Sequence, residues 1–329
     1  MRRLNVLTWH THGSYLYYLS HAPHEFHVLA RPGRPPGYGG RCGPFAFGPN
    51  VHDLPAAQAR ERQFDCILFQ EDHHWHKDQY ELLTPAQRAL PRIYLEHDPP
   101  GLLPGSAHVH HGSGATAWPT DVRHPVDDPN VLLVHVTPFN ALMWDSGRTP
   151  TRIIEHGVVL PEGVRYGGDI ERGLVVTNHL ARRGRRMGAD LFASLRADVP
   201  LDLVGMGSGG LGGIGEVDHP QLPALAARYR FVFSPVRYSS LSLSTVEAMM
   251  VGVPVVALAT AEMASVIAHG VSGFAVTDTR RLADAMRALL RDPGLARRLG
   301  AAGQRTALER FSIARFGADW DAALRHVTS

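Results

Sequence analysis

Short apolar runs alternate with amphipathic segments through the second half of the chain, and this alternation restricts the possible folds more than any other feature. The strand-like runs are RGLVVTN, PLDLVGMGS, RFVFSPV, VPVVAL and SGFAV, and the helix-like segments between them are MGADLFASLRADV, PQLPALAARY, STVEAMMVG and AEMASVIAHG. Strands that alternate with helices form crossover units. The pattern therefore predicts a parallel sheet covered by helices.

The first half repeats this pattern less regularly. Its apolar runs are LNVLTW, HEFHVLAR, FDCILFQ, RIYLEH, VLLVHV and TRIIEHGVV, with a helix expected at SYLYYL after Gly13. Proline and glycine crowd residues 32–55, and glycine recurs over 101–114, which predicts long loops there.

The length of the chain and one polar stretch predict two α/β domains. A chain of 329 residues is too long for one compact core, and the glycine-rich stretch Pro161–Asp169 separates its two halves. We expect Rossmann-like domains at 1–163 and 164–310. In such folds ligands bind at the carboxyl ends of the strands, so a cleft between the domains is the expected site.

The chain becomes helical after Asp278, where Leu282, Met286 and Leu289 share one helical face and Leu295, Leu299 and Leu308 mark another helix. The last helix carries an apolar stripe of Ile313, Phe316, Trp320 and Leu324, and only five residues follow it. Such a stripe needs cover, and the first domain has few helices of its own. We therefore expect residues 311–329 to pack back on the first domain.

Composition and charge restrict the partners and the compartment. The formal net charge is +2, from 33 basic and 31 acidic residues, which argues against a dedicated nucleic-acid binder. The cysteines are Cys42 and Cys66, which form no disulfide framework and favour a reducing compartment. Neither a signal peptide nor a bilayer-spanning apolar run is evident, so we expect a cytoplasmic protein with at most peripheral membrane contact.

The stretch SPVRYSSLSLSTVEAMMVGVPVVAL places several serines and one carboxylate at the start of a short helix. Ser244 and Glu247 have the spacing of a capping box, with Gly252 ending the helix in a left-handed conformation. Alternatively, the serine loop and the helix amides bind a phosphate, while Glu247 accepts hydrogen bonds from a ribose diol. The spacing alone leaves both interpretations open.

Several motifs resemble those of the retaining GT-B glycosyltransferases of family 4. The matches are EAMMVGVPVV from Glu247 and SVIAHGVSGFAV from Ser265, with GLVVTNHLARRGRRMGADLF, LVGMGSG, IIEHGVV and YLEHDPP as further pieces. The resemblance covers nearly the whole second domain and is thin over residues 1–150. It implies a GT-B fold, transfer of a sugar from a nucleotide-sugar donor with retention of configuration, a role in polysaccharide biosynthesis, and neither a metal nor another cofactor.

The resemblance also implies roles for particular residues. Arg185 or Arg186, with the amides from Ser240 through Leu241 to Ser242, would stabilise the leaving diphosphate. Glu247 would hold the ribose, and His97 would be the active-site histidine that follows a strand. The expected donor-binding set is Gly13, His179, Gly205, Ser239, Ser240, Leu241, Ser242 and Glu247.

Some of these positions depart from the family pattern or have a simpler explanation. Ser239 stands where the family has the first glutamate of its motif, and His179 stands where it has an arginine. An arginine replaces the family lysine, which suits a diphosphate because it can pair bidentately. Gly13 could be an ordinary turn glycine, and His97 a core or turn histidine.

The chain has 20 histidines, and two clusters resemble metal sites. EDHHWH (Glu71–His76) and HVHH (His108–His111) lack the i, i+4 pair with a carboxylate of a zincin, so we expect solvated or acceptor-cleft histidines and no metal.

Two alternatives to a sugar transferase remain. Ser239 allows a non-catalytic nucleotide-sugar-binding scaffold or regulator. An epimerase or phosphorylase of the same fold is the other alternative. A phosphorylase would need a cofactor lysine, and Lys77 is expected in a loop far from the serine motif. The sugar, the nucleotide base and the acceptor (a glycan, a lipid-linked sugar or another molecule) are left open.

Overall fold

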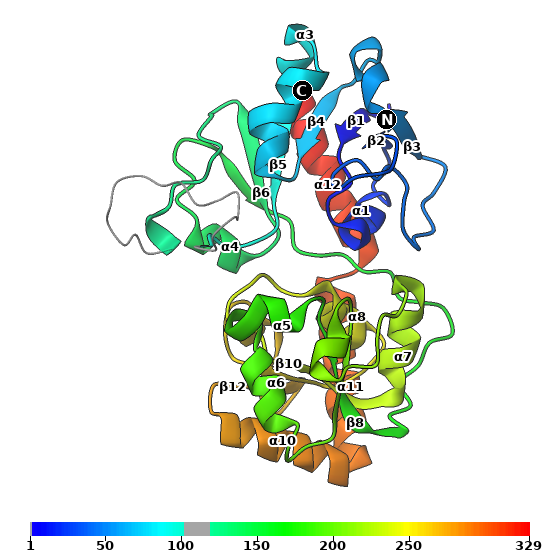
Figure 1. Ribbon diagram of the computed structural model, residues 1–329, viewed down its shortest axis with the longest axis vertical. Helices are drawn as coiled ribbons and strands as arrows, with labels where there is room; N and C mark the ends of the chain where they lie inside the picture. The colour runs from blue at the N-terminus through cyan, green and yellow to red at the C-terminus, as the bar shows by residue number, and fades with distance from the viewer. Residues whose placement is uncertain (1, 102–118) are drawn as a thin grey trace. The chain divides into compact units, whose positions relative to one another are not determined.

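The computed structural model describes residues 2–101 and 119–329 and divides the chain into two compact units (Figure 1). Unit 1 contains Met1–Gly157 and Ile313–Ser329, and unit 2 contains Val158–Ser312. The division falls after Gly157, a few residues before the stretch in which the sequence predicted it. The last helix is part of unit 1.

Unit 1 is built on a parallel sheet of seven strands. In the order in which they pair, the strands are β3 (Val51–Pro55), β2 (Glu25–Ala30), β1 (Asn5–Thr8), β4 (Cys66–Phe69), β5 (Arg92–Glu96), β6 (Val131–His135) and β7 (Thr151–Ile153). Chain order reverses between β1 and β4, whose registers pair Leu7 with Ile67. Ligands of open parallel sheets bind at such a reversal, beyond the carboxyl ends of the strands.

Short helices connect these strands. They are α1 (Gly13–Leu19), η1 (Ala56–Glu61), a π-helical turn η2 (His74–Asp78), α2 (Gln79–Leu82), α3 (Pro85–Arg88), η3 (Pro119–Asp121) and α4 (Pro138–Met143). Sequence reasoning missed β3, because its segment VHDLP offers only two apolar positions inside a region rich in proline and glycine. It pairs in parallel with β2 over five residues.

The last helix, α12 (Ile313–Thr328), packs on α1, β4 and β5 of unit 1 (Figure 1). Phe316, Trp320 and Leu324 are fully buried, and the Trp320 indole donates to the Tyr15 hydroxyl of α1 at 3.3 Å. A Cβ at Gly157 would come within 2.1 Å of Cβ of Phe316, so glycine permits this close packing.

Unit 2 is built on a parallel sheet of five strands, paired in the order β12 (Gly273–Val276), β11 (Val255–Leu258), β10 (Tyr229–Ser234), β8 (Ile170–Val176) and β9 (Leu201–Val204). Chain order reverses between β8 and β10. The loops that follow these two strands therefore meet at the edge where parallel sheets bind ligands.

The helices of unit 2 are α5 (Leu180–Arg183), η4 (Gly184–Met187), α6 (Ala189–Leu195), η5 (Ser208–Leu211), η6 (His219–Gln221), α7 (Leu222–Arg228), α8 (Leu243–Met250), α9 (Met263–Val266), α10 (Thr279–Arg291) and α11 (Pro293–Arg310). The helix predicted at AEMASVIAHG is only the four residues of α9, because Ile267 takes an extended conformation. Leu282, Met286 and Leu289 are fully buried in α10, as their shared face predicted, whereas Leu308 of α11 is 41% exposed.

Over the described residues, the helices fall short of the length and apolarity that a bilayer crossing requires.

Candidate functional site

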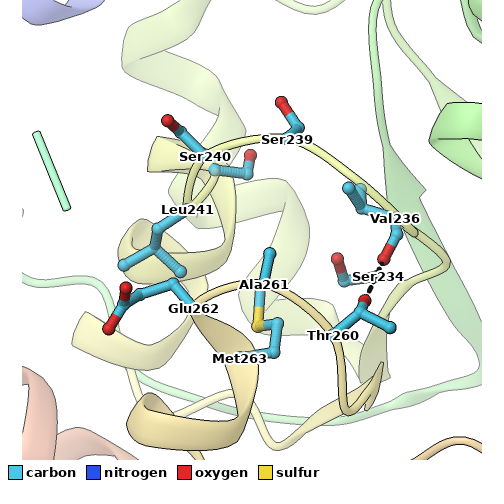
Figure 2. Close-up of a pocket in the computed structure, with 10 residues that line it drawn as sticks. Ser234, Val236, Ser239, Ser240, Leu241, Thr260, Ala261, Glu262 and Met263 are labelled. Atoms are coloured by element: carbon cyan, nitrogen blue, oxygen red, sulfur yellow. Dashed lines mark hydrogen bonds between the residues drawn. The ribbon is translucent and has the colours of Figure 1, made fainter. Parts of the chain in front are cut away.

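The loop after β10 and the turn after β11 line one pocket of unit 2 (Figure 2). Its lining residues are Ser234, Val236, Ser239, Ser240, Leu241, Ser242, Thr260, Ala261, Glu262 and Met263. The Thr260 hydroxyl donates to the carbonyl of Val236 at 2.7 Å and joins the two segments. The predicted serine loop thus contributes four consecutive residues to one cavity.

The serine loop leads directly into α8, which begins at Leu243 with Ser242 as its N-cap. The Ser242 side chain makes no capping hydrogen bond; its hydroxyl lies 2.6 Å from the hydroxyl of Ser244. Of the two interpretations left open by the sequence, the capping box of Ser244 and Glu247 is therefore wrong, because Ser244 lies inside the helix rather than at its cap. Gly252 does end the helix with a positive φ of 86°, as predicted.

Glu247 is 3% exposed and accepts a hydrogen bond from Nε2 of His219 at 2.9 Å. His219 belongs to η6, which lies 28 residues earlier in the chain. A buried carboxylate needs polar partners, and this pairing replaces the cap that the sequence suggested. Sequence reasoning missed His219, because the pair has no local signal.

The two candidate arginines differ in their surroundings. The Arg185 side chain is 77% exposed and pairs with Asp190 at 2.5 Å. Asp190 also accepts two hydrogen bonds from Arg237, and these arginines hold the pKa of its carboxyl below the ordinary value. Arg185 is therefore largely solvated and shares one carboxylate with Arg237.

The backbone of Arg186 is hydrogen-bonded to the segment that leads into the serine loop. Its carbonyl accepts hydrogen bonds from the amides of Arg237 and Tyr238, at 2.9 and 3.3 Å, directly before Ser239. Its Nε is buried and has no hydrogen-bond partner within the described residues. Of the two arginines, Arg186 has the less exposed side chain, and neither arginine is among the residues that line the pocket.

His179 and Gly205 lie in the loops that follow the neighbouring strands β8 and β9. His179 has a left-handed conformation with φ of 53°, and its amide donates to the carbonyl of Met206. Gly205 has φ of 138°, and a Cβ there would come within 2.6 Å of the carbonyl oxygen of Thr177. These two residues thus hold the loops after β8 and β9 against each other.

Glu262 supplies the pocket with a negative charge, which the Ser239 side chain cannot supply. Glu262 is 3% exposed and accepts hydrogen bonds from Arg310, at 3.1 Å, and from the hydroxyl of Ser265. Sequence reasoning missed Glu262, although its position just after the VPVVAL strand, at the carboxyl edge of the sheet, is a usable signal.

In unit 1, His97 follows β5 at the carboxyl edge of the sheet, as expected. Its Nε2 lies 3.1 Å from Oε1 of Gln70, and its ring lies 4.3 Å from the ring of His12 and 4.8 Å from that of Tyr15. Burial lowers the pKa of His97 well below its ordinary value, with smaller contributions from His12 and His156. The imidazole is therefore neutral at pH 7.

His12 and His156 complete this histidine group, and both were missed as site residues. His156 lies 5.8 Å from the Tyr15 ring, and Tyr15 contacts His97. His12 stands in HTHGSY just after the first strand, and His156 stands in IIEHGVV, so each was visible at a strand end.

Gly13 is the first residue of α1. A Cβ at this position would come within 2.4 Å of the Phe45 ring. A side chain at this position would therefore force the Phe45 ring to move.

The histidines of EDHHWH are not uniformly solvated. His74 is fully buried, and burial lowers its pKa to about 3, whereas the side chains of His73 and His76 are 46% and 49% exposed. Lys77, predicted in a loop, lies in η2 and is 3.8 Å from Glu81. His108–His111 lies outside the described residues.

Comparisons with known proteins agree with this arrangement. Residues 198–292 match the model of the family described as glycosyl transferases group 1. A sucrose-phosphate synthase from Thermosynechococcus elongatus is 16% identical over 99% of both chains, with a TM-score of 0.71. Anabaena HepE in complex with UDP and glucose is 15% identical over 99% of this chain and 100% of that chain, with a TM-score of 0.68. No curated protein matches the sequence.

A glycosyltransferase from Rickettsia africae also superposes, with a TM-score of 0.65 and 10% identity over 99% of both chains. These likenesses establish the fold as GT-B, with two Rossmann-like domains. The family match contains the serine loop, Glu247 and Glu262. The predicted resemblance of EAMMVGVPVV and SVIAHGVSGFAV to GT-B glycosyltransferases is therefore confirmed, whereas retention of configuration stays a prediction.

Proposed function

We propose that this chain, with its GT-B fold and its glycosyl transferases group 1 domain, transfers a sugar from a nucleotide-sugar donor to an acceptor. We further propose that transfer retains the anomeric configuration and needs no metal at the donor diphosphate. The observation that carries the proposal is the serine loop of unit 2, which lines a pocket and leads into a helix with a buried carboxylate.

In this proposal the nucleotide lies at the start of α8. Glu247 accepts hydrogen bonds from the ribose diol, and its bond to His219 fixes the carboxylate. The first-turn amides of α8 receive no cap from the Ser242 side chain, so they suit an anion. That HepE was crystallised with UDP and with UDP-glucose supports a uridine nucleotide as the first donor to try.

The chemical step breaks the bond from the sugar's anomeric carbon to the diphosphate and joins that carbon to an acceptor hydroxyl oxygen. The acceptor proton leaves with the diphosphate or to solvent. Negative charge develops on the leaving diphosphate, and preorganised donors stabilise it most effectively. Arg186, with the amides from Ser240 to Ser242, is proposed for this role, and neutral His97 is proposed to bind a hydroxyl of a substrate.

The sugar is proposed to face Ser239 and Glu262. Ser239 can donate or accept a hydrogen bond but carries no charge, whereas the Glu262 carboxylate lines the same pocket and is partly neutralised by Arg310. Ser239 stands where the resembled family has the first glutamate of its motif, so we expect a different preference for the sugar.

A thermal-shift panel of UDP-, GDP-, ADP-, CMP- and dTDP-sugars tests the binding part of the proposal. A ligand at a hundredfold excess over its dissociation constant stabilises the folded protein by about 2.7 kcal/mol. We expect one nucleotide class to raise the melting temperature. A panel without any shift would refute the proposed donor site.

The second candidate function is a non-catalytic nucleotide-sugar-binding protein, which Ser239 favours. Hydrolysis or transfer of the donor identified by the panel distinguishes the two functions. Turnover of that donor supports the transferase, whereas tight binding without any turnover supports the scaffold.

A further inference from the structure

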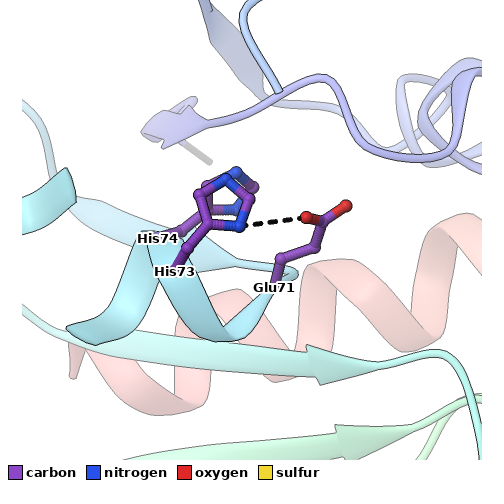
Figure 3. Close-up of side chains that lie close together, drawn as sticks. All are labelled: Glu71, His73 and His74. Carbon is purple, nitrogen blue, oxygen red and sulfur yellow. Dashed lines mark ion pairs between the residues drawn. The ribbon is translucent and has the colours of Figure 1, made fainter. Parts of the chain in front are cut away.

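Three side chains that could bind a metal gather after β4 in unit 1 (Figure 3). Glu71, His73 and His74 each bring one ligand atom within 4.8 Å of the other two. Nδ1 of His73 lies 3.1 Å from Oε2 of Glu71, and the two histidine rings lie 4.1 Å apart. The cluster stands at the reversal of chain order between β1 and β4, the edge where such sheets bind ligands.

His74 provides a second and independent observation. It is fully buried, and neither ring nitrogen has a hydrogen-bond partner within the described residues. Its ring stacks on Trp9 with centroids 4.7 Å apart and an interplanar angle of 14°. The stacking fixes the ring, but it satisfies neither nitrogen, and a buried polar group without a partner is costly.

Gly37 lies beside the two histidine rings and adds no side chain there. A Cβ at Gly37 would come within 3.0 Å of Nε2 of His74 and 3.6 Å of Nε2 of His73. Gly37 also has a φ of 81°, which a residue with a side chain rarely adopts. Both ring edges are therefore left without a covering side chain at this position.

We propose that Glu71, His73 and His74 bind one divalent transition-metal ion of the zinc type, with solvent completing the coordination. Two imidazole nitrogens and one carboxylate oxygen are a donor set that zinc, cobalt and nickel accept, whereas magnesium and calcium prefer oxygen. The exposed side chains of His73 and Glu71, 46% and 41%, give the ion a path from solvent.

To bind an ion, the three side chains need to move only a short distance. In a tetrahedral site with bonds of about 2.0–2.1 Å, ligand atoms lie about 3.4 Å apart. The His73–Glu71 pair at 3.1 Å already has this spacing, so His74 is the ligand that must approach. Asp78 is buried, with Oδ2 3.8 Å from Nε2 of His73, so it is placed to orient that ring when the other nitrogen binds the ion.

The test uses the full chain, freed of any polyhistidine tag and stripped with a chelator. Titration with Zn²⁺ is followed by calorimetry, and titration with Co²⁺ by its visible absorption, which reports nitrogen and oxygen ligands directly. We expect one equivalent of each ion to bind, and Mg²⁺ not to bind. Neither readout depends on the proposed sugar transfer, so either proposal can fail without the other.

His73→Asn and Glu71→Gln are the main variants, because both side chains are partly exposed and folding should survive. Each should weaken Zn²⁺ binding at least tenfold and change the Co²⁺ spectrum. His76→Asn is the matched control, since His76 lies in the same turn, is similarly exposed and pairs with Asp72 at 3.0 Å. It should bind like the wild type.

The proposal is overturned if the stripped wild type binds neither ion, or if it binds with the same affinity and spectrum after His73→Asn and Glu71→Gln. Equal loss in the His76→Asn control would also overturn it, because the ions would then occupy a different histidine set. The circular dichroism spectrum of each variant is compared with that of the wild type, so that loss of metal binding is not mistaken for loss of the fold.

Discussion

At the scale of single residues, Glu247 shows how a polar side chain can satisfy a local sequence pattern and yet take a distant partner. Its spacing from Ser244 suits a cap, but its carboxylate bonds to His219. The helix begins at Leu243, so a cap at Ser244 would fall inside the first turn. The carboxylate is thus no cap, and the proposed function assigns it to the nucleotide ribose.

The first prediction compares Glu247→Ala with Ser244→Ala. Loss of Glu247 should weaken donor binding far more than loss of Ser244, because only Glu247 is proposed to contact the ribose. The measurement is donor affinity by calorimetry, alongside the melting temperature. Unchanged donor affinity in the Glu247→Ala protein would contradict the assignment and leave the carboxylate a structural partner of His219.

The second prediction separates the two arginines. Arg186→Ala should reduce turnover by 10²-fold or more, since a cation facing the developing diphosphate charge is worth about 3 kcal/mol. Arg185→Ala should keep near-wild-type turnover, because Arg185 is exposed and paired with Asp190. Steady-state kinetics on both variants checks this. Wild-type turnover in both variants would show that neither cation acts on the diphosphate.

At the scale of elements, the sequence predicted most strands and most long helices, because buried runs and amphipathic stripes are local signals. It missed β3, whose VHDLP segment lacks a clear period, and it lengthened α9, which has only four residues. Apart from the packing of the last helix on the first domain, contacts between distant segments could not be predicted. The His219–Glu247 bond, the place of Glu262 and the choice between Arg185 and Arg186 all depend on how loops meet.

The third prediction concerns α12, whose stripe is buried within unit 1. Trp320 is fully buried and bonds to Tyr15, so Trp320→Ala should cost about 3–5 kcal/mol of unfolding free energy. The melting temperature should fall by roughly 10 °C. His326→Ala, an exposed change in the same helix, should have almost no effect. A Trp320→Ala protein that melts like the wild type would refute the docking of this helix.

At the scale of the whole molecule, unit 1 carries a built-in sensitivity to acid. Burial, and to a lesser degree His124, lowers the pKa of fully buried His135 from an ordinary 6.5 to about 3. Below pH 6.5 the unfolded chain binds a proton here that the folded chain does not. Stability therefore rises with pH in this window and falls as the pH is lowered from 6.5 toward 3.

The fourth prediction follows from this rise of stability with pH. Between pH 6 and 4, His135 should contribute a loss of about 1.4 kcal/mol for each pH unit. His135→Asn, which cannot ionise, should lower stability at pH 7 but flatten its dependence on pH. Urea unfolding at several pH values measures both slopes. Parallel slopes for variant and wild type would mean that His135 does not titrate as its burial requires.

The two units also differ in how the chain builds them, and the last prediction uses this difference. Unit 2 is one continuous segment, Val158–Ser312, whereas unit 1 needs both ends of the chain. Residues 158–312 expressed alone should therefore fold cooperatively and retain weak binding of the nucleotide identified by the donor panel, because the serine loop and Glu247 lie within them.

Residues 1–157 alone lack α12, which would uncover the apolar surface that Trp320 and Phe316 now bury on α1, β4 and β5. Such a fragment should aggregate or melt at a much lower temperature, and adding a peptide of residues 313–329 should partly restore it. Thermal melts and light scattering of the two fragments test this. A stable, monomeric 1–157 fragment, or a 158–312 fragment that stays unfolded, would show that cooperative folding does not follow the division into units.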